Sequence, residues 1–343
     1  MFFNKRFLLG ASITTSLITL LVMQVGFGKL VNALAGANYI YVIPGIVVYF
    51  ASIYLRSYRW RYLLYPFAKT ETIRLYPVVS VGYAANNLLP LRIGELARSY
   101  YLAKREPIRA STGLATILTE RIFDGLTLLL VVALVAIFIP LNGFVVNLSM
   151  EMQIPTWFLI TSATLPFIFA FSLVIASSLL PESLNRIIST LATLLPSRAE
   201  KSIKGISLRF LQGFIGLHRP SRLVAIFALS IPVWLTEAVV YFIIAMGFGL
   251  NEQFDTVLFM VAGLLLVTSI SNLATSVPSS PGSVGAFELL ATVTLVFLGI
   301  KPDIAAAYAI VLHLTLLIPI TCFGLLMILR EGLTLGQLTK NNN

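Results

Sequence analysis

Long apolar segments dominate the pattern of this chain. They cover residues 7–27, 38–55, 125–141, 156–180, 223–250, 256–270 and 303–329. Most of them approach or exceed the roughly 18 residues that mark a membrane-spanning helix. Hydrocarbon offers no partner to an unpaired backbone group, so each segment is predicted to be helical. A transmembrane β-barrel would instead show short stretches of alternating apolar and polar residues. The pattern therefore predicts an all-α, polytopic integral membrane protein.

The composition supports this interpretation. Of the 343 residues, 58% are apolar and 11% are charged, with a mean hydropathy of +0.91, whereas soluble domains carry roughly 25% charged residues. Cys322 is the single cysteine, which excludes an intrachain disulfide and a cysteine-based metal cluster. The sequence contains no Walker loop, zinc-ligand spacing or convincing nucleophile elbow. We therefore expect no cofactor, no metal and no enzymatic activity.

The first apolar segment allows two interpretations. It follows Lys5 and Arg6, and Ala33-Leu34-Ala35 lies after it, as in a cleaved signal peptide. However, the apolar region is longer than the usual ~7–15 residues, and the candidate cleavage site lies well beyond its end. We therefore favour an uncleaved membrane anchor.

The net charge of +10 is explained better by membrane topology than by nucleic-acid binding, because the basic residues gather in particular segments. Arg56, Arg59 and Arg61 are assigned to a loop after segment 38–55, and further basic residues lie before the first segment, around 98–109, within 181–222 and near the C-terminus. Segments 140–155 and 251–255 contain none. The positive-inside rule then predicts a multi-pass protein of the cytoplasmic (plasma) membrane with both termini in the cytoplasm.

Two apolar regions are interrupted by polar residues, proline and glycine. Residues 86–95 carry amides and charges in the middle of segment 75–102, and residues 276–288 interrupt segment 256–299. Broken backbone at membrane depth is tolerated where protein or a watery cavity surrounds it. Both flanks of segment 75–102 are basic and belong to the cytoplasmic side, whereas both ends of segment 256–299 belong to the outer side. We therefore predict that each segment is a re-entrant helical hairpin.

The two breaks share a spacing. In each break a proline precedes a glycine by four positions, Pro90 and Gly94 in the first and Pro281 and Gly285 in the second. A glutamate follows each glycine within three positions. Hairpins that enter from opposite sides imply an inverted repeat, an architecture of transporters that bind substrate between discontinuous helices. We expect about six spanning helices plus the two hairpins. The predicted single membrane domain (1–343) divides into a first repeat (38–139) with hairpin 75–102, a cytoplasmic interfacial segment (181–222), and a second repeat (223–330) with hairpin 256–299.

Ionisable residues inside apolar segments cost about 2.5–3.5 kcal/mol each on insertion scales and are candidates for function. Glu120 and Asp124 share one helix face beside Arg121, either as a packing network or as part of a site. Arg92 at a break, next to a helix N-terminus, suits a phosphate, and His313 is either a proton relay or a packing residue. The candidate substrate-binding residues are Asn86, Asn87, Pro90, Arg92, Glu95, Arg98, Glu120, Arg121, Asp124, Glu237, Pro281, Gly282, Ser283, Glu288 and His313.

Three motifs carry a resemblance to a known family: residues 87–98 (NLLPLRIGELAR), 119–124 (TERIFD) and 281–288 (PGSVGAFE). In this order they resemble the flippase-like membrane domain of the lysylphosphatidylglycerol synthase/flippase family. The resemblance implies movement of phospholipids or lipid-linked sugar intermediates between leaflets. Full-length members append a cytosolic aminoacyl-transferase domain, so we expect this chain to transport lipid without synthesising it. The final helix of the family often carries arginine where this chain has His313.

Our hypothesis is that Arg92, Arg121 and two half-helix N-termini hold the phosphate of an anionic lipid, while acidic residues could instead select a cationic head group such as lysyl. Two alternatives stay open. Glu120 or Asp124 could act as general base in an enzyme of polyprenyl-linked substrates, or the chain could anchor a glycosyltransferase or lipid-synthesising enzyme. Membrane lipid is the expected partner, with no nucleic acid, and a homo-oligomer is compatible with the sequence.

Overall fold

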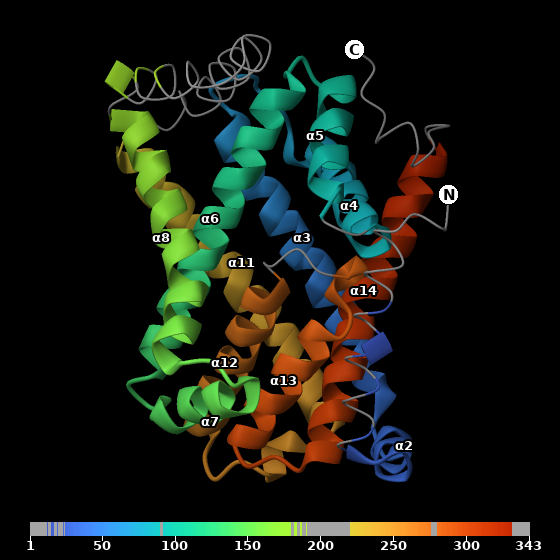
Figure 1. Ribbon diagram of the computed structural model, residues 1–343. Helices are drawn as coiled ribbons and strands as arrows, with labels where there is room; N and C mark the ends of the chain where they lie inside the picture. Colours follow the sequence, from blue (N-terminus) through green and yellow to red (C-terminus); the bar gives the residue numbers. More distant parts are fainter. Residues whose placement is uncertain are drawn as a thin grey trace.

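The computed structural model describes residues 25–89, 92–179, 220–275 and 280–330, with a few single positions outside these ranges. The described residues form helices and turns and contain no strand, which confirms the all-α prediction (Figure 1). The α-helices are α2 (Phe27–Ala35), α3 (Val42–Leu64), α4 (Thr72–Leu88), α5 (Gly94–Arg105), α6 (Ala110–Val135), α7 (Asn142–Met152), α8 (Thr156–Leu179), α11 (Pro220–Gly247), α12 (Val257–Thr275), α13 (Ala286–Phe297) and α14 (Pro302–Arg330). The 3₁₀ turns are η1 (Tyr39–Tyr41), η3 (Leu250–Glu252) and η4 (Pro281–Ser283).

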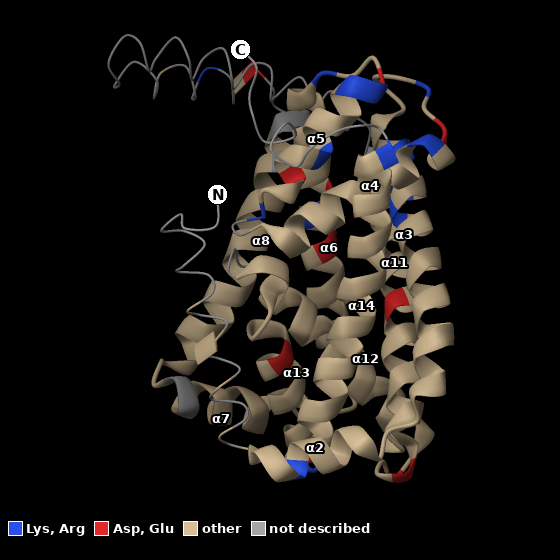
Figure 2. Ribbon diagram, turned by 90° about the vertical axis from the view of Figure 1, so that its right-hand side faces the viewer, with Lys and Arg blue, Asp and Glu red and all other residues tan. Residues whose placement is uncertain are grey.

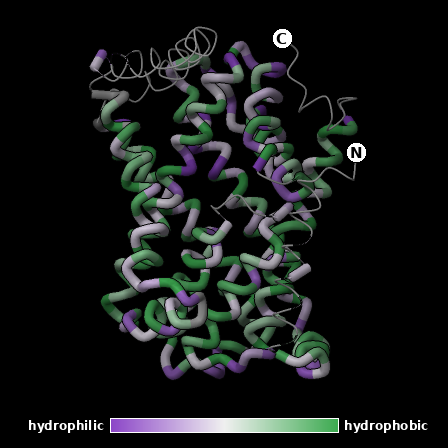
Figure 3. Tube along the Cα trace, viewed as in Figure 1, coloured by the Kyte–Doolittle hydropathy of each residue, from purple (hydrophilic) through white to green (hydrophobic). Residues whose placement is uncertain are grey.

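The long helices confirm a multi-pass membrane protein. Within the described ranges, 5 helices are long and apolar enough to cross a bilayer: Tyr39–Leu64, Thr156–Leu173, Ser221–Gly247, Val257–Thr275 and Pro302–Arg330. Hydrophobic positions predominate along the helices, with hydrophilic ones interspersed in the middle and at the ends of the bundle (Figure 3). Most of the first apolar segment and of segment 181–222 lies outside the described residues, as does Pro90.

Two boundaries differ from the sequence prediction. The apolar segment 125–141 covers only the second part of α6 and runs past its end at Val135, whereas the helix already begins at Ala110 and contains the charged residues of 119–124. The segment between residues 140 and 155, predicted only as a loop, contains α7, whose Phe144 lies 5.1 Å from the ring of Phe297 in α13. Hydropathy averages miss the first part of α6, because it contains paired charges, and the whole of α7, because it is short.

The packing of the helices has a twofold pattern. Helix α3 packs against α11, α4 packs against α14, and α12 packs against α6. Within each half, the helix pairs α4–α5 and α12–α13 pack against the helix that follows them, α6 and α14. Figure 1 shows α4 and α5 in the upper half of the bundle and α12 and α13 in the lower half. This pattern is the one that an inverted repeat would produce; the repeat boundaries and re-entrant entry stay predictions.

Glycines permit the closest helix contacts. A Cβ atom on Gly94 would lie 2.3 Å from the carbonyl oxygen of Gly82, so α5 folds back on α4 with backbones in contact. A Cβ atom on Gly324 would lie 2.6 Å from the carbonyl oxygen of Ser80, so α14 approaches α4 equally closely. Small residues at such crossings are typical of membrane helix packing.

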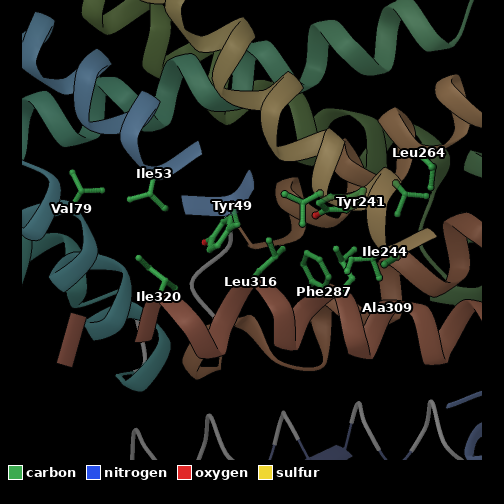
Figure 4. Packing of buried hydrophobic residues seen from close by; sticks show 14 of the residues in the cluster. Tyr49, Ile53, Val79, Tyr241, Ile244, Leu264, Phe287, Ala309, Leu316 and Ile320 are labelled. Carbon is green, nitrogen blue, oxygen red and sulfur yellow. The ribbon is translucent and has the colours of Figure 1, made fainter. Parts of the chain in front are cut away.

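The buried apolar core joins both halves. Figure 4 shows Tyr49 and Ile53 of α3 near Tyr241 of α11, with Phe287 of α13 and Leu316 of α14 beside them. The basic residues gather instead at the end of the bundle near α5, as Figure 2 shows, although α2, at the opposite end, also has a basic position. We refer below to the α5 end and the α7 end of the bundle.

Candidate functional site

Two arginines of α3 lie inside the bundle. Arg56 is 4% exposed and Arg59 is 1% exposed, which corrects their assignment to a cytoplasmic loop. Helix α3 continues to Leu64, nine residues beyond the apolar segment that ends at residue 55. A buried charge is tolerated when it is paired, and each of these arginines has carboxylate partners on other helices. The hydropathy pattern therefore underestimated the length of this helix.

The first part of the charged network joins α3, α5 and α6. Arg59 Nη1 lies 2.7 Å from Asp124 Oδ1, and Arg59 Nη2 lies 3.5 Å from Glu120 Oε1. Arg98 Nη1 lies 2.8 Å from Glu120 Oε2, and its guanidinium covers the ring of Trp60 at 3.7 Å. These side chains are almost fully buried, so this part of the network fixes helix packing.

The second part of the network extends to α11 and to the first break. Arg56 forms an ion pair with Glu237, which had no local partner in the sequence, and its Nη1 lies 4.0 Å from Asp124 Oδ2. Arg121 contacts Asp124 at 3.6 Å and Glu95 at 3.0 Å. Arg92 contacts the same Glu95 oxygen at 3.4 Å. Two guanidinium groups thus share one carboxylate.

The linked groups carry an excess of positive charge. The network contains five arginines and four carboxylates, a formal net charge of +1: Arg56, Arg59, Arg92, Arg98 and Arg121 against Glu95, Glu120, Asp124 and Glu237. The side chains of Arg92 and Arg121 are 25% and 23% exposed, whereas those of the other three arginines are 2–6% exposed. Arg92 and Arg121 are therefore the most exposed cations of this network.

A cavity lies between the two breaks, and we call it the charged cavity. Its volume is about 130 Å³ as available to the centres of water molecules, compared with roughly 10–15 Å³ needed for one water. The cavity can therefore hold a hydrated polar group. Its lining residues are Tyr49, Arg56, Tyr83, Asn86, Asn87, Arg92, Arg121, Asp124, Leu128, Trp234, Glu237, Asn272, Thr275, Ser280, Gly282, Ser283, Phe287, His313, Leu316 and Leu317.

The charged cavity lies at mid-depth of the bundle. Asp124 comes 14 residues after the start of α6 and 11 before its end, which at 1.5 Å per residue is about 21 Å and about 16 Å. At the breaks the backbone leaves helical geometry: Arg92, Gly282 and Ser283 have φ angles of 54°, 62° and 57°. Helix α4 packs against η4, so the two breaks adjoin.

The N-terminus of α13 differs from the sequence prediction. We expected free amides of this half-helix to face an anion. Instead, Glu288 Oε2 accepts a hydrogen bond from the Gly285 N–H at 2.7 Å, and Glu288 Oε1 lies 2.7 Å from His313 Nδ1. A carboxylate at this helix end repels an anion, so the cations of the cavity, rather than this helix end, would bind one. His313 also stacks on Phe287 with ring centroids 4.1 Å apart.

The structure brings most of the predicted site residues together. Those that line the cavity are Asn86, Asn87, Arg92, Arg121, Asp124, Glu237, Gly282, Ser283 and His313. Glu95, Arg98, Glu120, Pro281 and Glu288 do not line it; Glu95, Arg98 and Glu120 instead form ion pairs, and Glu288 contacts His313. Pro90 lies outside the described residues.

Sequence reasoning missed several lining residues. Arg56 directly follows the apolar segment 38–55. Because it lies one helical turn after residue 52 of that segment, the helix could have been predicted to continue through Arg56. Trp234 carries no such signal, although its indole Nε1–H donates to Asp124 Oδ1 at 3.1 Å and Arg56 lies 4.7 Å above its ring. The contacts between α11 and α6 bring Trp234 to the site, and these depend on the tertiary fold.

A second cavity, the apolar pocket, adjoins the first. It lies between α6, α11 and α12, and Leu128 and Trp234 line both cavities. Its volume on the same measure is about 250 Å³. The lining residues are Thr127, Leu128, Leu130, Val131, Leu134, Val135, Phe138, Ile231, Trp234, Leu235, Leu258, Val261, Ala262, Leu265, Thr268 and Ser269.

This fold and site define a polytopic α-helical membrane protein with a cationic cavity at mid-depth. The chain belongs to the family described as the lysylphosphatidylglycerol synthase transmembrane region, which matches residues 7–324. The resemblance noted in the motifs is thereby confirmed, and the protein has a lipid-related function in a membrane.

Curated relatives match at low identity over most of the chain. Two UPF0104 membrane proteins of Methanothermobacter thermautotrophicus are 22% and 24% identical, over 92% and 90% of this chain and 93% and 88% of theirs. Glycosyltransferase AglD of Haloferax volcanii is 22% identical over 89% of this chain, but the match covers 51% of that protein. No solved structure matches the chain.

Proposed function

We propose that this protein moves an anionic lipid between the leaflets of its membrane, with the lipid phosphate held by Arg92 and Arg121 in the charged cavity. The substrate is a phospholipid, aminoacylated or not, or a lipid-linked intermediate. The observation that carries the proposal is a cavity at mid-depth, between two helix breaks, where the two least buried arginines of a net-positive network share one carboxylate. Binding of one phosphate would neutralise the excess charge.

The fold offers a route for the movement. In the proposal, α4–α5 and α12–α13 are re-entrant hairpins of two inverted repeats, and the repeats rock against each other around the cavity, as in transporters with this architecture. The α5 end, where basic residues gather, faces the cytoplasm according to the positive-inside rule. The protein would then lie in the plasma membrane with both termini inside, and it would act without chemical catalysis.

A liposome assay tests the role of the arginines. Purified protein is reconstituted with fluorescent phosphatidylglycerol, and a reductant added outside measures how fast the probe changes leaflet. We expect Arg92→Ala and Arg121→Ala each to slow movement at least tenfold, which corresponds to about 1.4 kcal/mol. Lys104→Ala is the matched control, because Lys104 is an exposed cation of α5 outside the cavity. Arginine variants that are folded and as fast as wild type would refute the proposal.

One observation favours a second candidate function. The match to Glycosyltransferase AglD covers about half of that protein, so a domain like this one occurs beside a further segment in a protein named as a glycosyltransferase. The present chain could serve as the membrane partner of a separate glycosyltransferase or lipid-synthesising enzyme. Co-purification of such an enzyme, together with no lipid movement by the chain alone, would support this second function over transport.

The enzymatic alternative has less support from the geometry. Glu120 does not line the charged cavity and is held by Arg59 and Arg98, while Asp124 lines the cavity but is engaged by three arginines. A general base needs access to the proton that it removes. Formation of a product from a polyprenyl-linked substrate by the purified protein would revive this alternative.

A further inference from the structure

Two observations show that the apolar pocket is a hydrocarbon surface. Its lining positions on α12 are spaced as one helical face, at residues 258, 261, 262, 265, 268 and 269. The hydroxyl groups of Thr127, Thr268 and Ser269 each donate to a carbonyl oxygen of their own helix, at 2.7, 2.7 and 2.9 Å. The pocket therefore presents methyl and methylene groups, with no hydroxyl hydrogen left for a ligand.

The pocket opens on the outer surface of the bundle. Leu134 is 50% exposed, Leu235 is 49% exposed and Leu258 is 62% exposed, one from each of its three helices. These side chains face the bilayer in a membrane protein of this fold. A hydrocarbon chain of a membrane lipid can therefore enter the pocket sideways from the bilayer without crossing a polar surface.

Trp234 connects the pocket to the charged cavity. Its indole N–H donates to Asp124 on the polar side, while the same side chain lines the pocket on the other. Leu128 is the second shared residue. A molecule with a charged group in the charged cavity would thus have an apolar surface directly beside it, where its hydrocarbon can lie.

We propose that the apolar pocket seats one hydrocarbon chain of the same lipid whose phosphate lies against Arg92 and Arg121. The identity of the ligand rests on the proposed function, but the position of its hydrocarbon chain is a separate inference. Continuity with the cationic cavity selects a lipid over a protein segment, because a lipid joins an anionic group to hydrocarbon within one molecule.

The direction of the pocket defines the orientation of the bound lipid. The lining of α6 runs from Thr127, near the charged cavity, to Val135 at the end of the helix, which points toward the α7 end (Figure 1), and Phe138 follows just beyond it. The eight-residue step from Thr127 to Val135 rises about 12 Å, somewhat less than half of the ~30 Å hydrocarbon core. The chain of the bound lipid points toward the α7 end, as in a lipid of the leaflet at the α5 end. The lipid is therefore loaded from that leaflet, with its head group drawn to mid-depth.

Photolabelling in nanodiscs tests the position and the orientation. The probes are two phosphatidylglycerols, one with a diazirine near the carboxyl end of an acyl chain and one near the methyl end. Adducts that unlabelled phosphatidylglycerol displaces are mapped by mass spectrometry. We expect the first probe to label near Leu128 and Trp234, and the second near Phe138 and Leu258. A reversed order would overturn the orientation, and displaceable labelling spread equally over the exposed face of α14 would overturn the pocket.

A matched pair of variants provides an independent readout. Leu134→Trp fills the pocket, whereas Leu326→Trp places the same ring on α14, and the two leucines are 50% and 46% exposed. We expect Leu134→Trp to lower displaceable labelling and lipid movement at least tenfold, with Leu326→Trp within twofold of wild type. Equal effects of the two variants would overturn the inference.

The two proposals fail differently. If Arg92→Ala and Arg121→Ala abolish lipid movement but the photoprobes do not label the pocket, the proposed position of the hydrocarbon chain is wrong and the proposed function stands. If the phosphatidylglycerol probes label the pocket but the wild-type protein moves no lipid, the proposed position of the hydrocarbon chain stands and the proposed function is wrong.

Discussion

The ion pair between Arg56 and Glu237 ties α3 to α11 across the two predicted repeats, and its two ends are not equivalent. Both side chains are 5% exposed. When Glu237 is replaced by leucine, Arg56 keeps Asp124 at 4.0 Å and the ring of Trp234 at 4.7 Å. When Arg56 is replaced by methionine, Glu237 loses the ion-pair partner that the described residues give it. The arginine variant should therefore be the less stable one.

Magnitudes follow from the burial of the pair. Removing one partner of a buried ion pair costs about 3–5 kcal/mol, because it leaves an uncompensated charge, whereas replacing both by apolar residues is often near neutral. We expect Arg56→Met to lower the free energy of unfolding by about 3–5 kcal/mol. Glu237→Leu should cost less, about 2–3 kcal/mol, because Arg56 retains contacts. The double variant should lie closer to wild type than either single variant.

Equilibrium unfolding in mixed micelles with increasing SDS, followed by tryptophan fluorescence, measures these free energies for all four proteins of the cycle. The order of stability is the decisive result. A double variant that loses the sum of the two single losses would show that the two side chains do not interact. A Glu237→Leu variant less stable than Arg56→Met would refute the asymmetry argued from the contacts.

Two further predictions concern the helix crossings. Gly94→Ala should destabilise the protein by about 1–3 kcal/mol in the same SDS titration, because the added Cβ would lie 2.3 Å from a backbone oxygen; Gly28→Ala, with nothing within 4 Å of its Cβ, is the control, and equal losses would contradict this account. Asn87→Leu removes the hydrogen bond to Thr321 Oγ1 at 2.8 Å between α4 and α14, so a loss of about 1 kcal/mol is expected, and an unchanged unfolding midpoint would show that this bond adds nothing.

The sequence predicted much of the fold because its signals were local. Apolar runs located most of the long helices, and proline, glycine and amides located both breaks. Helix boundaries were less predictable. Helix α3 extends past its apolar run, since Arg56 and Arg59 are neutralised by carboxylates on α6 and α11, and a hydropathy average counts such residues as unpaired.

The candidate site was predictable to a similar degree. Arg92 and Glu95 stood out as charges at a break, and the spacing of Glu120 and Asp124 placed them on one helix face beside Arg121. Their roles depend on contacts that sequence spacing cannot give, since Arg56 and Glu237 are 181 positions apart. These contacts separate the buried structural pairs from Arg92 and Arg121, the two more exposed arginines of the cavity.

The distances along the chain between charged partners also constrain how the protein enters its membrane. Arg59 precedes Asp124 by 65 residues and Arg56 precedes Glu237 by 181. At roughly 5–20 residues per second of synthesis, Arg59 waits about 3–13 s and Arg56 about 9–36 s for these partners. Meanwhile their long side chains can extend to the interface at the α5 end. We therefore expect α3 to insert shallowly at first and to reach its final depth only after α6, and then α11, has been made.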